Sequence, residues 1–400
     1  MNGARPRLLF ISPRFLFPLD EGGKIRTSNI LRQMRGKEFD ITLASPAPSP
    51  EAHASDIADI ADRFLSWPTP KPSPLAKVLA VPGRLPISVA TDRSPAGCAT
   101  VARALAERPD VVVGDFPHAG VLLPDRFEIP SVMFTHNIEA EIYERHAAVA
   151  PFPQRLVWQN EARKMRRYEG ETLRRFDVAI AVSARDGEGL RKQYGLDSIE
   201  LIDTGVDLDF YPFSPPPSEP VLVFSGAMDS RSNIDGIDFL LDDVWPLIAR
   251  ARPDARAVIV GRNPPAALVA KAQNRGLPWR FTGFVDDIRP HIAAAQVSVI
   301  PLRVGSGTRI KAFEAMALGR PVVSTTLGVE GLDITSNEHF LVADSAADFA
   351  GAILRLFDDS ALRNRLARAA RARLEERFSW VHVARQFEAI CLRAMRQRTE

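Results

Sequence analysis

The chain has 400 residues, 46% of them hydrophobic, so it is long enough for two or three domains with a buried core in each. Its 51 Lys and Arg residues nearly balance its 49 Asp and Glu residues, and a formal net charge of +2 excludes a polycation built to bind nucleic acid. The two cysteines, Cys98 and Cys391, stand far apart, which excludes a disulfide framework or a Cys-x-x-Cys metal site and makes a reducing compartment the expectation.

Short, continuous apolar runs recur through the first half of the chain. They lie at residues 8–12, 41–44, 111–115, 131–135, 177–182 and 199–202. Longer segments with helical patterns separate them. Because continuous apolar runs are typical of parallel strands that are covered on both faces, this alternation predicts a doubly wound α/β sheet.

Prolines mark the end of the first predicted domain. They cluster in residues 212–220, where they block helix formation and favour a stiff, extended segment. The alternation then restarts, with apolar runs at residues 221–226, 257–261, 280–283, 297–301, 321–325 and 340–342. We therefore predict an N-terminal domain over residues 1–211, a linker over 212–220, a second domain over 221–378 and a C-terminal helix over 379–400.

Glycines follow the first predicted strand, at the edge where parallel sheets bind ligands. Gly22 and Gly23 precede a helix that we expect to start near Arg26. Glycine allows close approach of the backbone to a ligand, and a helix N-terminus favours an anion. These residues indicate either a phosphate site or a plain glycine-containing turn.

A histidine follows the predicted strand at residues 131–135. His136 lies at the carboxyl end of that strand, which is the end that faces ligands in this class of fold. It is a candidate ligand contact, and a hydrogen-bonded turn histidine is the alternative. No pair of histidines in the sequence has the spacing of metal ligands.

The segment after the predicted strand at 297–301 combines glycines, hydroxyls and cations. Its polar and glycine residues are Gly305, Ser306, Gly307, Thr308, Arg309 and Lys311. A helix must begin here, so backbone N–H groups, a capping hydroxyl and the positive end of the helix dipole converge. The segment predicts a phosphate or diphosphate site, with a surface glycine turn as the alternative. It is not a P-loop, because no Gly-Lys-Ser/Thr closes it.

Glu314 lies about two turns into the same predicted helix, which Gly319 and Pro321 end. If its carboxylate faces the same edge of the sheet, it suits a pair of ribose hydroxyls, as an acidic residue does in dinucleotide sites.

With these residues in view, the sequence resembles the retaining glycosyltransferases of the GT-B fold, in family 4, also called group 1. The most specific part is the run from Gly305 to Val323, which contains Phe-Glu-Ala-Met-Ala at residues 313–317. Residues 226–229 and 301–303 resemble a subgroup associated with bacterial exopolysaccharide assembly. The resemblance implies two Rossmann-like, doubly wound domains that face each other across a cleft.

The resemblance also implies roles for residues of the second domain. Glu314 would bind the nucleotide ribose, and Arg231 with Lys311 or Arg309 would hold the diphosphate of a nucleotide-diphosphate sugar, the donor substrate. Backbone near Val285 would meet the base. In the first domain, which receives the acceptor in this family, Gly22 and Gly23 would approach the phosphates and His136 would lie near the transferred sugar. The last helix would cross back to the first domain.

Two positions depart from the family pattern. Ser306 stands where members often have a second glutamate, and Asn233 stands where many have a lysine. Because a serine does not bind sugar hydroxyls as a carboxylate does, the transferred sugar stays open. The departure at Ser306 also motivates a different class of function, a non-catalytic nucleotide-sugar-binding or assembly subunit. A GT-B epimerase or phosphorylase is a third alternative.

No metal or other cofactor is expected for this reaction, because cations and N–H groups can neutralise a departing diphosphate. Asp207-Leu208-Asp209 is similar to the Asp-x-Asp of metal-dependent transferases. We interpret Asp207 instead as part of the family motif that precedes residues 212–220.

The remaining expectations concern the acceptor, contact with a membrane and the cellular location. The resemblance implies a saccharide or lipid-linked acceptor. Residues 155–175 are rich in arginine and include Leu156, Val157 and Trp158, which suits peripheral contact with an anionic membrane or a solvated helix face. No apolar stretch reaches the length of a membrane helix. We therefore expect a cytoplasmic protein, with the inner face of the membrane as one location.

Overall fold

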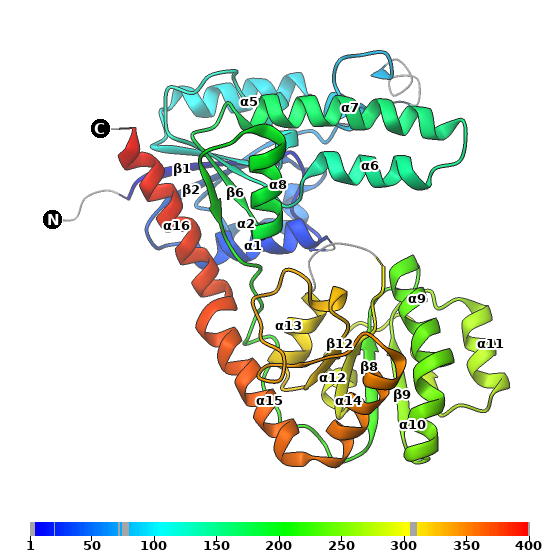
Figure 1. Cartoon of the computed structure of the whole chain (residues 1–400). Helices are drawn as coiled ribbons and strands as arrows, with labels where there is room; N and C mark the ends of the chain where they lie inside the picture. Colours follow the sequence, from blue (N-terminus) through cyan, green and yellow to red (C-terminus); the bar gives the residue numbers. More distant parts are fainter. Residues whose placement is uncertain (1–4, 20, 71–72, 74–79, 305–309, 399–400) are drawn as a thin grey trace. The chain divides into compact units, whose positions relative to one another are not determined.

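The structure, a computed structural model, describes residues 5–19, 21–70, 73, 80–304 and 310–398 (Figure 1). It divides into two compact units. Unit 1 comprises Met1–Asp203 and Trp380–Glu400, and unit 2 comprises Thr204–Ser379. The chain therefore passes between units at residues 203/204 and again at 379/380. The first division falls before the predicted boundary at residue 211.

Unit 1 contains a parallel sheet of seven strands in its described part, in the order β3-β2-β1-β4-β5-β6-β7. The strands are β1 (Arg7–Ile11), β2 (Asp40–Pro46), β3 (Arg63–Trp67), β4 (Val111–Asp115), β5 (Ser131–Phe134), β6 (Val178–Ala181) and β7 (Ile199–Leu201). The predicted doubly wound α/β class is confirmed. The sequence did not predict β3, because this edge strand is mostly part-exposed and so lacks a continuous apolar run.

The helices of unit 1 connect these strands and include the last helix of the chain. They are α1 (Gly22–Met34), α2 (Ala54–Ala58), α4 (Ile87–Asp92), α5 (Pro95–Ala106), α6 (Glu139–Val149), α7 (Gln154–Leu173), α8 (Ala184–Tyr194) and α16 (Trp380–Gln397), with the 3-10 helices η1 (Pro50–His53) and η2 (Pro117–Leu122). Helix α1 begins earlier than Arg26, and Glu21 accepts its first hydrogen bond, from Ile25 N at 3.0 Å. Gly22 and Gly23 therefore occupy its first turn.

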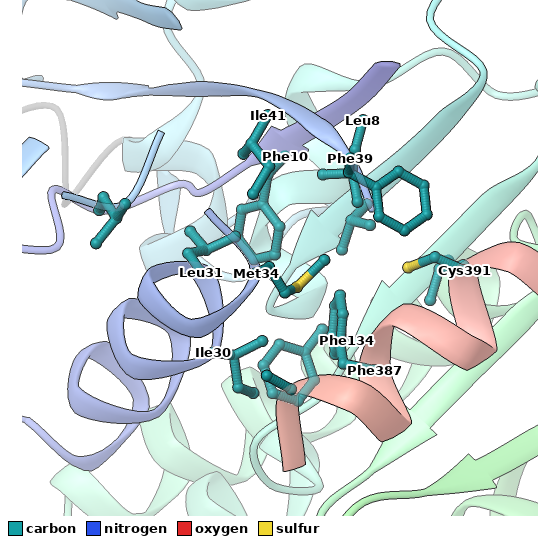
Figure 2. Close-up of a cluster of buried hydrophobic side chains, with 14 of the residues drawn as sticks. Leu8, Phe10, Ile30, Leu31, Met34, Phe39, Ile41, Phe134, Phe387 and Cys391 are labelled. Carbon is teal, nitrogen blue, oxygen red and sulfur yellow. The ribbon is translucent and has the colours of Figure 1, made fainter. Parts of the chain in front are cut away.

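Helices α1 and α16 bury apolar side chains against the strands of unit 1 (Figure 2). The Phe387 ring of α16 packs edge-on against Phe134 of β5, with 5.2 Å between ring centroids, and lies 6.4 Å from Phe10 of β1. Cys391 and Met34 are fully buried beside them. Burial raises the pKa of the Cys391 thiol, so this cysteine is a core residue.

Unit 2 contains a parallel sheet of six strands in its described part, in the order β10-β9-β8-β11-β12-β13. The strands are β8 (Val221–Ser225), β9 (Arg256–Val260), β10 (Trp279–Phe281), β11 (Val297–Ile300), β12 (Val322–Ser324) and β13 (Leu341–Val342). The helices are α9 (Arg231–Phe239), α10 (Trp245–Ala251), α11 (Ala266–Asn274), α12 (Arg289–Ala293), α13 (Ile310–Ala317), α14 (Ala346–Asp358) and α15 (Ser360–Arg373), with the short helices η3 (Leu240–Val244), η4 (Leu327–Val329) and η5 (Leu374–Phe378). Each of these strands overlaps a predicted apolar run.

The proline-rich segment 212–220 belongs to unit 2 and is not a separate linker. Arg320, which is fully buried, donates a hydrogen bond to Ser214 Oγ at 2.9 Å. Gly319 has a φ of 78° and lies so close to this segment that a Cβ there would stand 2.5 Å from the Ser214 carbonyl oxygen. Val206 N donates to Phe378 O at 2.7 Å, which ties residues after Asp203 to the end of unit 2. These contacts explain why the boundary precedes the prolines.

Candidate functional site

Each sheet has a point where the strand order reverses, between β1 and β4 in unit 1 and between β8 and β11 in unit 2. Chain connections leave such a point in opposite directions, so a crevice forms outside the carboxyl ends of the two strands. The residues predicted from sequence cluster after these strands and the neighbouring β5.

In unit 2, the first turns of α9 and α13 are joined at this reversal. Lys311 Nζ donates to Asn233 Oδ1 at 2.9 Å, and Asn233 Nδ2 donates to the Ala227 carbonyl at 2.8 Å. A Cβ on Gly226 would stand 2.9 Å from Lys311 Nζ, so any other residue after β8 would displace this ammonium. The Lys311 ammonium also lies 4.6 Å from the centroid of the Phe224 ring. It is thus held over the carboxyl end of β8.

Glu314 lies one turn beyond Lys311 on α13. Its Oε1 accepts a hydrogen bond from the Tyr211 hydroxyl at 2.8 Å. Burial raises the pKa of Glu314, and this hydrogen bond and the charge of Lys311 act in the opposite direction. Burial, with the nearby Glu314 charge, raises the pKa of Tyr211 as well. Sequence reasoning missed Tyr211, because the predicted boundary placed it at the end of the N-terminal domain, whereas it belongs to unit 2 with Glu314.

Two arginines near this reversal differ in their contacts. Arg303, after β11, makes an ion pair with Asp235 of α9 at 2.8 Å, and its guanidinium lies 4.7 Å from the Phe239 ring centroid. Arg231 is the exposed first residue of α9, and within the described parts of the chain it makes no ion pair or hydrogen bond. Of these two arginines, Arg231 is therefore the one still available to an anion.

Of the other predicted residues of unit 2, the structure describes only Val285. Val285 follows β10 and is half-buried against the core of the unit, whereas its neighbour Phe284 is 72% exposed. Gly305, Ser306, Gly307, Thr308 and Arg309 lie outside the described residues.

In unit 1, His136 is buried, with 2% of its surface exposed. Its Nε2 lies 2.7 Å from Asp115 Oδ1, and its Nδ1 lies 3.0 Å from the Arg26 guanidinium. Because a guanidinium only donates, Nδ1 accepts and Nε2 carries the proton that bonds Asp115. Burial lowers the pKa of His136, although Asp115 acts to raise it, so the ring is neutral. In this arrangement both ring nitrogens are occupied.

Asp115, at the carboxyl end of β4, organises this group. Its two carboxylate oxygens also accept hydrogen bonds from Ser12 Oγ at 2.9 Å and from Thr27 Oγ1 at 3.1 Å. The end of β1, the end of β4 and the helix α1 are thereby linked to His136. Sequence reasoning found His136 and missed Asp115. The signal was present, because an aspartate that ends a buried apolar strand requires polar partners.

The glycines of α1 lie close to this group. A Cβ on Gly23 would collide with the ring of Phe116, so this position admits glycine alone without a shift of that ring. Gly22 has open space around it. Phe116 has a φ of 62°, and its ring centroid lies 4.1 Å from that of His136.

Two buried carboxyl groups, Glu139 of α6 and Glu169 of α7, meet at the first turn of α6. Glu169 of α7 accepts hydrogen bonds from the backbone N–H groups of Glu139 at 2.8 Å and of Ala140 at 3.0 Å, which caps α6. Burial, with the neighbouring charge of Glu169, raises the pKa of Glu139 to about 7.

The acidic, histidine and cysteine side chains also bear on whether a metal could bind. Within the described ranges, no three His, Cys, Asp or Glu side chains are grouped as metal ligands would be. Asp207 Oδ1 accepts from the backbone N–H groups of Asp209 at 3.1 Å and Phe210 at 2.9 Å, which makes it a turn residue. Among the described helices, none combines the length and the apolar character needed to cross a membrane.

Two comparisons with solved structures define the class of protein. The chain superposes on sucrose-phosphate synthase from Thermosynechococcus elongatus with a TM-score of 0.68 and 19% identity over 96% of this chain and 98% of that one. HepE from Anabaena, solved in complex with UDP, gives a TM-score of 0.66 and 18% identity over 96% of this chain and 99% of that one. The fold is that of the GT-B glycosyltransferases.

Sequence comparisons identify the family. The family described as Glycosyltransferase Family 4 matches residues 21–210, and that described as Glycosyl transferases group 1 matches residues 219–359. Glycogen synthase from Mycobacterium tuberculosis is 27% identical over 308 residues, which span 72% of this chain and 70% of that protein. The chain therefore belongs to the group 1, family 4 glycosyltransferases, as its sequence motifs had implied.

Proposed function

We propose that this glycosyltransferase transfers a hexose or related sugar from a nucleotide-diphosphate sugar to a saccharide or lipid-linked acceptor, with retention of anomeric configuration, in the synthesis of a bacterial polysaccharide or glycoconjugate. The observation that carries the proposal is the arrangement of Lys311 and Glu314 on α13 beside the reversal between β8 and β11. The UDP bound to HepE supports a nucleoside diphosphate as the ligand class.

Glu314 is assigned to the ribose of the donor. A carboxylate accepts from two vicinal hydroxyls, and Tyr211 holds one of its oxygens, so the other oxygen remains for the sugar of the nucleotide. The backbone at Val285 is assigned to the base.

Lys311 and Arg231 are assigned to the diphosphate. As the anomeric bond breaks, negative charge grows on the departing diphosphate, and the Lys311 ammonium, which Asn233 holds in place, stabilises that charge together with Arg231 without a metal ion. Asn233 orients the Lys311 ammonium in place of the lysine that many relatives have. The segment Gly305–Arg309 is assigned to the same group through its N–H groups and Arg309.

Unit 1 is assigned to the acceptor and the transferred sugar. His136 is assigned a place near the transferred sugar, and its hydrogen bonds with Asp115 and Arg26 fix the orientation of its ring. Gly22, which is exposed, and Gly23, which is half-buried, are assigned to a phosphate through the N–H groups of the first turn of α1. A lipid-linked acceptor would place the reaction at the inner face of the cytoplasmic membrane.

A donor panel tests this proposal. The purified protein is incubated with UDP-, GDP-, ADP- and dTDP-sugars, and nucleotide release is followed with and without acceptors extracted from cells, and with and without EDTA. We expect one donor to release nucleotide in an acceptor-dependent, EDTA-insensitive way, with the donor's anomeric configuration in the product by NMR. Binding without transfer would favour the non-catalytic subunit, and no binding of any donor would contradict the proposal.

A further inference from the structure

The helices α6 and α7 form a hairpin whose turn is apolar and exposed. Figure 1 shows the two helices side by side, with the turn between them at the end farthest from the strands of unit 1. Residues 151–157, which we call the hairpin tip, are all exposed. Within the tip, Phe152 is 81% exposed, Leu156 56% and Val157 45%. Three exposed large apolar side chains thus fall within six residues, a concentration that indicates a surface for a partner.

The hairpin is well packed just behind this tip. Trp158 stacks on His146, with 4.6 Å between ring centroids, and lies 5.9 Å from Tyr143. The sequence suggested that Trp158 contacts a membrane surface. In the structure it instead packs α7 against α6. Phe152, which the sequence did not single out, is the most exposed aromatic residue of the tip.

Cations without carboxylate partners lie in the tip and behind it along α7. Within the described residues, no ion pair involves Arg84, Arg155 or Arg163. Other cations of α7 are neutralised: Lys164 pairs with Glu161 at 2.7 Å, and Arg167 pairs with Glu171 at 3.7 Å. The positive charge left near the tip therefore comes from three arginines.

Two recesses lie on α7, and Arg163 lines both. One, of about 470 Å³, lies between α7 and residues 81–84 and includes Arg84. The other, of about 440 Å³, lies between α7 and α6 and includes Arg155. Each recess thus contains two arginines without an ion pair in the described chain, Arg84 and Arg163 in the first and Arg155 and Arg163 in the second. Glu144 also lines the second recess, where its charge is neutralised by an ion pair with Arg166. Guanidinium groups are the chemistry that binds phosphate esters.

We propose that the hairpin tip with Arg84, Arg155 and Arg163 docks on an anionic lipid bilayer. Phe152, Leu156 and Val157 enter the interface between headgroups and acyl chains, and the arginines bind lipid phosphates in the two recesses. A role for this docking rests on the proposed function, because a lipid-linked acceptor would lie at the membrane surface. Charge complementarity favours a bilayer over a second copy of the chain, since two such positive tips would repel.

Vesicle flotation of the full-length protein tests the docking. Vesicles of phosphatidylcholine alone are compared with vesicles that contain phosphatidylglycerol, at low and high salt. We expect binding to the anionic vesicles that weakens as salt rises, and about tenfold weaker binding for Phe152→Ser/Leu156→Ser and for Arg155→Gln/Arg163→Gln.

Matched variants and independent readouts keep the test decisive. Phe284→Ser replaces an equally exposed phenylalanine of unit 2, and Arg103→Gln/Arg250→Gln removes two exposed arginines elsewhere; both should bind vesicles like the parent. Circular dichroism checks folding, and nucleotide release in solution, which the hairpin variants should retain, reports the proposed function separately. Equal binding to neutral vesicles, no vesicle binding, unchanged binding by both hairpin variants, or a dimer in sedimentation that the hairpin variants abolish would overturn the proposal.

Discussion

At the scale of single residues, Tyr211 controls the ionisation of Glu314. The tyrosine hydroxyl donates to the carboxylate, and so holds down a pKa that burial raises. If the ionised carboxylate binds the ribose, donor affinity falls as the pH is lowered, and it falls at a higher pH than an ordinary glutamate would require.

Tyr211→Phe tests this coupling. Loss of the hydrogen bond raises the pKa of Glu314 further, so the acidic decline in affinity should move to higher pH. At neutral pH the affinity for nucleoside diphosphate should fall about threefold to tenfold, the size of one net hydrogen bond. Calorimetric titration across the pH range measures both effects, and identical profiles for the parent and the variant would contradict them.

The buried carboxyl of Glu139 predicts a pH dependence of stability. Its pKa of about 7 in the folded protein exceeds the ordinary value of 4.5, so the folded state holds this proton more tightly than the unfolded state. Its contribution to stability therefore declines as the pH rises from 4.5 to 7. Glu139→Gln should remove this loss and stabilise unit 1 by up to about 3 kcal/mol above pH 7, with little gain near pH 4.5.

Urea unfolding of the parent and Glu139→Gln at several pH values measures this difference. Glu188→Gln, an exposed glutamate of α8, serves as the control and should show no such trend. A stability difference that does not grow with pH would contradict the assignment of a raised pKa to Glu139.

At the scale of secondary-structure elements, the approach of α9 to the end of β11 depends on a glycine. A Cβ on Gly236 would stand 2.8 Å from the Pro301 carbonyl oxygen, a backbone atom that has little room to move. Gly236→Ala should therefore cost about 1–3 kcal/mol and displace Asn233 from Lys311.

Gly351→Ala is the matched control within unit 2. Gly351 lies inside α14 with open space around it, so alanine there should add about 0.5–1 kcal/mol to stability. Thermal unfolding of both variants compares the same substitution in two helices. Equal effects would show that helix propensity, and not the contact with Pro301, decides the outcome at Gly236.

The sequence predicted most strands because parallel strands buried on both faces are continuous apolar runs. It missed β3, an edge strand whose residues other than Trp67 are exposed or half-buried, and it set the start of α1 too late, because glycines in a first turn look like a loop. Near the site it found His136, Lys311 and Glu314. Asp115 was overlooked although an aspartate at the end of a buried strand requires polar partners, whereas Tyr211 was missed because its role depends on a contact with Glu314, 103 residues away.

At the scale of the whole molecule, unit 2 is continuous in sequence and unit 1 is not. Composition placed the boundary at the prolines, but pairing of Val206 with Phe378 and the contacts of Ser214 assign those residues to unit 2. No local pattern in the sequence reveals such long-range contacts, so the prolines alone misplace the division.

This organisation predicts how fragments behave. Residues 204–379 should fold alone, with a cooperative thermal transition, because both apolar clusters of unit 2 lie within them. Residues 1–203 should not fold alone, because removal of α16 exposes Phe10 and Phe134, which this helix covers. A covalent fusion of residues 380–400 to this fragment should restore folding. Cooperative unfolding of residues 1–203 alone would contradict the role of α16.

The central claim is that Glu314 and its neighbours in unit 2 bind the nucleotide of a sugar donor. The most direct measurement is the affinity of Glu314→Gln for the nucleoside diphosphate of the preferred donor, beside the parent and the exposed control Glu330→Gln. We predict about 30- to 100-fold weaker binding for Glu314→Gln, the size of a charge-assisted hydrogen bond, and no change for the control. Affinity and nucleotide release equal to those of the parent in Glu314→Gln would contradict the claim.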